Sequence, residues 1–118
     1  MDDPQQPRAP DAFTAATLLS LQEALATVYW YKSDLRSFLE HVLSDRMLLR
    51  LLDWQDNKRS IVATLVALLA RDPERYGQDL RRLVTEVARV EDFRHLLRLD
   101  DGGEKAQQAR EAVAALRD

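Results

Sequence analysis

The segment 57–70, NKRSIVATLVALLA, constrains the fold more than any other part of this chain. As a helix it has almost no polar face, because every position from 61 to 70 except Thr64 is apolar. A helix that is apolar nearly all round is normally enclosed by other helices. We therefore expect a compact all-α bundle around this central helix, and we look for function on its outer surface.

Composition places the rest of the chain in the same fold class. The 118 residues suffice for one hydrophobic core, and three of the four prolines lie in the first ten residues. Because few helix breakers remain, we expect residues 13–118 to form one domain, a bundle of six to seven short antiparallel helices. Residues 1–12 are polar and rich in proline, so we expect them to form a disordered tail.

Apolar spacing and capping residues locate the individual helices. We expect helices over residues 14–30, 34–43, 45–54, 57–71, 73–90, 91–99 and 104–117. The expected caps are Thr14 or Ser20, Ser33, Ser44, and Asp56 or Asn57, with Pro73 opening the fifth helix. The third helix is expected to bury Met47, Leu48, Leu51 and Leu52.

Three consecutive aromatic residues, Tyr29, Trp30 and Tyr31, close the first helix. Three adjacent rings cannot all face one core, so at least one should lie near the surface or under the second helix. Two interpretations stay open, namely core packing of two rings and an exposed ring at a protein interface. Trp54, after the Leu-rich third helix, is expected to cover the core.

No arrangement of residues in the sequence indicates a reaction. The two histidines, His41 and His95, do not converge with carboxylates, so we interpret both as partly exposed helix residues. The serines lack the elbow of a nucleophile, the chain has no glycine-rich phosphate loop, and the absence of cysteine excludes thiolate metal sites. We therefore expect a protein that is not an enzyme and uses no cofactor or metal.

The sequence also argues against export, a membrane anchor and nucleic acid binding. Its start is acidic and lacks the apolar region of a signal peptide. The apolar run 61–70 is about half of the ~20 residues that a membrane span needs. The net charge of -3 gives no general attraction to nucleic acid. Because a chain without cysteine is typical of a reducing compartment, we expect a cytoplasmic protein.

Two sets of charged residues are the candidate contact sites. The basic set lies on or beside the expected fifth helix and comprises Arg75, Arg81, Arg82 and Arg89. The acidic set lies on or near the expected second and third helices and comprises Glu40, Asp45, Asp53 and Asp56. Each set is either a solvated face or half of a heterologous contact, in which the basic face of one molecule meets the acidic face of another.

Several elements between residues 18 and 99 resemble a known class of helical domain. They are Leu21, Ala24 and Leu25, an aromatic Tyr29 or Tyr31, the L-x-x-F-L of Leu35, Phe38 and Leu39, and Lys58 leading into Ile61, Val62, Leu65 and Val66. This pattern is similar to the effector-associated, death-fold-like (CARD-like) domains at the ends of bacterial antiviral-defense proteins. The resemblance implies a death-fold-like bundle that acts as a non-catalytic adaptor.

The resemblance also implies how such a domain would work. Pairing between like domains would couple a sensor to an effector in antiphage defense, and assembly would raise the effective concentration of the tethered partners. The expected partner is therefore a protein, either a second copy or a similar helical domain. An alternative hypothesis is a stand-alone regulatory protein that binds a small ligand or nucleic acid.

Overall fold

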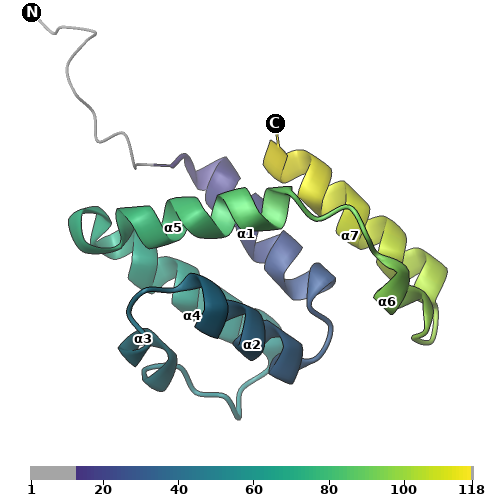
Figure 1. Cartoon of the computed structure of the whole chain (residues 1–118), viewed down its shortest axis with the longest axis horizontal. Coiled ribbons are helices and arrows are strands. Elements are labelled where there is room, and N and C mark those ends of the chain that lie inside the picture. The colour runs from purple at the N-terminus through teal and green to yellow at the C-terminus, as the bar shows by residue number, and fades with distance from the viewer. Residues whose placement is uncertain (1–12, 118) are drawn as a thin grey trace, which may run out of the picture.

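The computed structural model describes residues 13–117, and these residues form seven helices and no strand (Figure 1). The helices are α1 (Ala15–Val28), α2 (Lys32–Val42), α3 (Met47–Arg50), α4 (Lys58–Arg71), α5 (Pro73–Ala88), α6 (Arg94–Leu97) and α7 (Gly102–Arg117). The all-α prediction is thus confirmed within this range. The expected tail, residues 1–12, lies outside the described residues.

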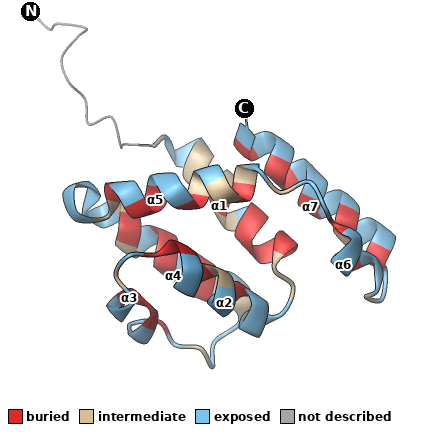
Figure 2. Ribbon diagram, viewed as in Figure 1, coloured by how far each residue is buried: buried red, intermediate tan, exposed pale blue. Residues whose placement is uncertain are grey.

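The most enclosed helix is α1. It packs extensively against α7 and also contacts α4 and α5. Its second half is buried without interruption from Ala24 to Val28. The other six helices each add buried apolar residues to the same core and each have an exposed outer side (Figure 2).

The expectation that α4 is enclosed on all sides is wrong. One side of α4 packs on α1 and α5 and buries Ile61, Val62, Leu65, Val66 and Leu69. On the other side, Ala63, Thr64 and Ala67 are exposed. Small residues such as alanine are tolerated on a surface, so an apolar pattern that depends on them does not require a second core contact.

Three helices begin with side-chain caps, and the sequence predicts two of them, Thr14 and Asn57, as one of two alternatives each. Thr14 Oγ1 accepts a hydrogen bond from the Thr17 amide at 3.1 Å, which selects Thr14 and not Ser20 as the cap of α1. Asn57 Oδ1 accepts from the Ser60 amide at 2.8 Å and caps α4. Before α5, the Asp72 carboxylate accepts from the Arg75 amide at 3.2 Å. Each such bond satisfies one backbone donor that the first helical turn leaves unpaired.

The predicted caps of α2 and α3 are wrong. Helix α2 begins at Lys32, so Ser33 lies inside it, and the preceding Tyr31 makes no side-chain cap bond. Helix α3 is a single turn that begins at Met47 with no side-chain cap bond from Arg46. Ser44 lies before that turn, where it contacts α5 instead.

The corner between α6 and α7 requires a glycine at one position. Gly102 is buried at the first position of α7, and a Cβ added there would come within 2.6 Å of the carbonyl oxygens of Leu96 and Leu97. The preceding Asp101 has a φ of 56°, in the left-handed region that Asp tolerates better than most residues. The chain therefore turns tightly before Gly102, where the start of α7 packs on the backbone of α6.

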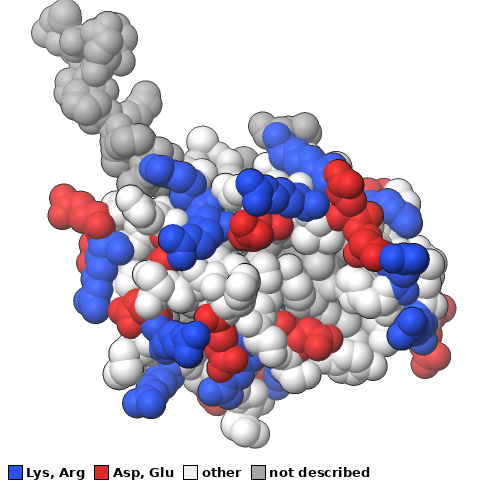
Figure 3. Space-filling model, in the orientation of Figure 1, with Lys and Arg blue, Asp and Glu red and all other residues white. Residues whose placement is uncertain are grey.

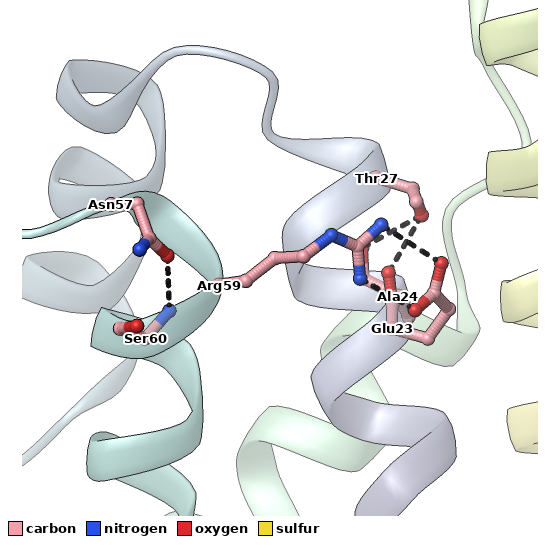
Figure 4. A network of polar contacts seen from close by, with 6 residues as sticks. All are labelled: Glu23, Ala24, Thr27, Asn57, Arg59 and Ser60. Carbon is pink, nitrogen blue, oxygen red and sulfur yellow. Dashed lines mark hydrogen bonds and ion pairs between the residues drawn. The ribbon is translucent and has the colours of Figure 1, made fainter.

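A polar contact joins α1 to the start of α4 on the surface of the bundle. Figure 4 shows Arg59 reaching from α4 to Glu23 on α1, where its two terminal nitrogens lie 2.7 and 3.2 Å from the carboxylate oxygens. The hydrogen bond from Arg59 lowers the pKa of Glu23 below its usual value. Because both side chains are about half exposed, the pair orients the helices more than it stabilizes them.

No helix within residues 13–117 has both the length and the apolar character needed to cross a membrane.

Candidate interaction surface

The two predicted charged sets lie next to each other within one molecule. Arg75 of α5 forms an ion pair with Asp45 at 3.3 Å. Arg82, two turns further along α5, donates from Nη1 to the backbone oxygen of Val42 at 3.1 Å. We call residues 43–46 the α2–α3 connector. Arg75 contacts this connector through Asp45, and Arg82 contacts Val42, the residue just before it. Part of the basic set is therefore already bound to the region that carries part of the acidic set.

The remaining members of both sets make local contacts. Arg89 pairs with Glu86 at 3.4 Å and Glu40 with Arg36 at 3.6 Å, each along its own helix. The Asp53 and Asp56 carboxylates accept from the backbone amides of Gln55 and Asn57. Arg81 and Arg82, with Gln78 and Thr85, line a shallow hollow of about 290 Å³ on the outer side of α5. A contact between charged faces of two molecules stays a prediction.

Charges of both signs are interspersed over the molecular face in Figure 3. Over α5 several basic groups lie close together with acidic groups beside them, and elsewhere on this face the two signs are mixed. A broad area without charged side chains lies in the middle of this face, between α5 and α2. Charge alone therefore does not mark one binding face on this side.

A buried carboxylate fixes the α2–α3 connector to α5. Asp79 is 4% exposed, and its two oxygens accept from the Ser44 amide at 3.2 Å and from the Ser44 hydroxyl at 3.0 Å. Asp79 was not among the predicted site residues. Its position in the sequence indicates burial, because Asp79 lies three residues after Tyr76 and four before Leu83 and therefore shares their side of the helix.

The first residue of α3 and the residue that directly follows it expose large apolar side chains, and this corrects the sequence prediction. Met47 is 58% exposed and Leu51 is 65% exposed, whereas both were expected to be buried. They are four residues apart and therefore neighbors on one side of the turn. The buried side of this segment consists of Leu48, Leu49 and Leu52.

Two arginines flank this apolar pair. Arg46 and Arg50 are exposed, and neither side chain has a hydrogen bond or ion pair with another described residue. We call Arg46, Met47, Arg50 and Leu51 the α3 face. It combines exposed apolar area with the positive charge of two arginines, and among residues 13–117 no other two exposed large apolar side chains lie within four residues of each other.

Trp54 connects the α3 segment to the core and to α2. Its indole nitrogen donates to the Leu49 carbonyl at 2.9 Å, and its ring packs against the core. Lys32 of α2 donates to the Trp54 carbonyl at 3.1 Å, and the Arg36 guanidinium lies 5.2 Å from the center of the indole ring. The expectation that Trp54 covers the core is confirmed, and its contacts hold α3 on the body of the bundle.

The aromatic triplet divides as the sequence predicts, with one ring exposed. Tyr31 is exposed, whereas Tyr29 and Trp30 are partly buried. Tyr29 stacks on Phe38 of α2 with a centroid distance of 4.4 Å. Two ammonium groups lie near the Trp30 ring, Lys58 at 4.4 Å and Lys105 at 4.6 Å from its center.

Cationic and polar side chains satisfy the carbonyl groups at the end of α1. Lys58 Nζ donates to the carbonyls of Tyr29 and Trp30 at 3.2 and 2.8 Å. Desolvation, together with repulsion from Arg59, lowers the pKa of Lys58 to about 8. His95 of α6 binds the Val28 carbonyl at 2.7 Å through Nε2, which must carry the proton because a carbonyl oxygen only accepts.

A groove opens beside this junction. It has a volume of about 350 Å³, its surface is mostly apolar, and it is lined by Val28, Tyr29, Asp34, Ser37 and His95. We call it the α1–α2 groove. Its volume falls at the lower end of the range for small-molecule sites, about 300 to 1,000 Å³.

Within the described part of the chain, no three His, Cys, Asp or Glu side chains come together in a geometry that could hold a metal ion. His41 is exposed, and His95 makes the single contact described above.

No family model, curated protein or solved structure matches this chain.

Proposed function

We propose that this domain is a non-catalytic protein-interaction module and that the α3 face is its contact surface. The observation that carries the proposal is the exposure of Met47, the first residue of α3, beside Leu51, which directly follows α3, in a segment that is fixed to the bundle. Soluble proteins commonly expose single apolar residues, but a cluster with a polar rim is typical of a binding site.

The composition of the α3 face fits a protein partner. Apolar side chains that become buried at the center of an interface supply most of the binding free energy, and surrounding polar groups exclude water. Arg46 and Arg50 would form such a rim and would favor a partner that presents a carboxylate beside an apolar surface. Arginine and methionine are both enriched at protein interfaces relative to other surfaces.

The resemblance to effector-associated, death-fold-like domains gives this contact a role. We propose homotypic assembly that couples a sensor to an effector in bacterial antiphage defense, with no catalysis by this domain. Modest contacts suffice in such a role, because tethering raises the effective concentration of the joined partners.

The double variant Met47→Glu/Leu51→Glu tests the proposal. Both positions are exposed, so we expect unchanged helicity and melting temperature but loss of self-association, measured by sedimentation velocity over a concentration series. Leu19→Glu is the matched control, because Leu19 is 64% exposed on α1, away from α3. Self-association that persists in the double variant, or a wild-type chain that stays monomeric at every concentration, would contradict the proposal.

A further inference from the structure

We infer that Lys58 is an acylation site, at which an acyl phosphate transfers its acyl group to the side-chain nitrogen. Lys58 is the first residue of α4, and its side chain reaches the end of α1. The inference goes beyond the proposed function, because the α3 face takes no part in it. Either of the two can therefore fail while the other stands.

Neutral groups hold the Lys58 side chain. Its Nζ atom donates to the carbonyls of Tyr29 and Trp30 at 3.2 and 2.8 Å and lies 4.4 Å from the center of the Trp30 ring. Among residues 13–117, no carboxylate forms an ion pair with Lys58. The charged groups near it are cationic, namely Arg59 beside it in the sequence and Lys105 at the same ring. This site therefore lacks the negative charge that usually keeps a proton on a lysine.

A neutral amine fits the same contacts. It keeps two N–H groups, as many as the two carbonyls bind, and gains a lone pair that can attack an acyl carbon. Because desolvation lowers the pKa of Lys58 to about 8, its neutral fraction at pH 7 is about 300 times that of a lysine with the usual value of 10.5. Lower basicity also makes an amine less nucleophilic, and the slope known for thiols, about 0.4 to 0.5, leaves a gain of about 20- to 30-fold.

The second lysine at the ring favors an anionic donor. The Nζ atoms of Lys58 and Lys105 lie 4.4 and 4.6 Å from the center of the Trp30 ring, so they are no more than about 9 Å apart. Lys105 donates to the carbonyl of Asp100 and has no carboxylate partner among the described residues. Its charge would attract the phosphate group of a donor whose acyl carbon approaches Lys58.

The transfer needs no further reactant. The lone pair on Nζ forms the carbon–nitrogen bond, while the bond between the acyl carbon and the phosphate oxygen breaks. The phosphate leaves with that electron pair, the amine releases one proton to solvent, and the product is a neutral amide.

Acylation would loosen the junction between α1 and α2. The amide keeps one N–H group, so it can bind only one of the two carbonyls, and the cation at the Trp30 ring is lost. Amide hydrogen exchange in residues 29–32 should therefore be faster in the acetylated chain than in the unmodified chain. Equal exchange would contradict this effect.

Acetyl phosphate is the probe for the site itself. The chain has three lysines, Lys32, Lys58 and Lys105, so mass spectrometry of peptides gives a separate acetylation rate for each. At pH 7.5 we expect Lys58 to react about ten times faster than the other two, since partial burial offsets part of the gain in reactivity. The preference should disappear in guanidinium chloride. A folded chain in which Lys58 reacts no faster than the others would overturn the inference.

A second reagent tests the role of the phosphate. Lys105→Gln should slow acetylation of Lys58 by acetyl phosphate several-fold, but should change little with the uncharged N-hydroxysuccinimidyl acetate. Arg110→Gln is the matched control, because it removes a cation from the same helix that lies over Phe93 and not over Trp30. If Lys105→Gln leaves the reaction with acetyl phosphate unchanged, or slows both reagents equally, the donor is not recognized through its phosphate.

Discussion

Helix α1 and the α3 segment contain similar apolar residues but bury them to different extents. Leucines 21 and 25 of α1 are fully buried, because α4, α5 and α7 all pack on that helix. Helix α3 has a single turn, packs one side on the core through Leu48 and Leu49, and is also held by polar contacts from α5 and Trp54. The comparison shows that a leucine-rich segment in this chain indicates a core only where neighboring helices are long enough to surround it.

The largest expected effect is on stability and separates the two regions directly. Leu25→Ala should lower the free energy of unfolding by about 2 to 5 kcal/mol, since it leaves a cavity in an enclosed site. Leu51→Ala should change it by less than about 0.5 kcal/mol, because the side chain is already in water. Urea denaturation followed by circular dichroism measures both. Equal losses for the two variants would mean that α3 is as enclosed as α1.

A smaller effect is expected at the contact that holds α3. Asp79→Ala removes both bonds to Ser44 and should cost about 1 to 3 kcal/mol. The loss should be local, so amide hydrogen exchange should accelerate between residues 44 and 52 more than in α1. Ser44→Ala removes one of the two bonds and should show the same pattern more weakly. Uniform acceleration across the bundle would contradict a local role.

The smallest effect concerns pH and the junction at the end of α1. With a pKa of about 8 in the folded state against its usual 10.5, Lys58 keeps its proton between these values only when the chain is unfolded. The unfolded state then binds more protons, so the contribution of Lys58 makes the unfolding free energy rise with pH across this window.

Tryptophan fluorescence can follow this titration. The variant Trp54→Phe leaves Trp30 as the only tryptophan, with the Lys58 ammonium 4.4 Å from its ring center. We expect its emission to change with a midpoint near pH 8, and Lys58→Met to abolish that change. Because Lys105 also lies 4.6 Å from this ring center, the assignment depends on Lys58→Met: a transition that this variant abolishes but whose midpoint is near the usual value of 10.5 would show that Lys58 is not desolvated.

Much of the fold followed from local chemistry in the sequence. The cap at Asn57 and the position of Pro73 could be predicted because they depend on residues within one turn. The enclosure of α4 could not, because the number of helices that cover a helix depends on tertiary packing. A run of apolar residues is compatible with one buried side or two.

The candidate surface was harder to predict than the fold. In the run from Met47 to Leu52, five of six residues are apolar, and helical spacing does not say which side faces inward. Met47 and Leu51 were therefore predicted to be buried, but both are exposed. The contact between Ser44 and Asp79 joins residues 35 positions apart, and no pattern within one helix contains it. The charged sets were recognized, but not the pairing of Arg75 with Asp45 in the same molecule.

The clamp that α5 places on the α2–α3 connector has a consequence for binding kinetics. Because Arg75, Asp79 and Arg82 hold this connector in the free protein, α3 does not have to fold when it meets a partner. Association should then proceed at the ordinary rate for docking two preformed surfaces, about 10⁵ to 10⁷ M⁻¹s⁻¹. Differences in affinity among variants of the α3 face should accordingly arise in the dissociation rate.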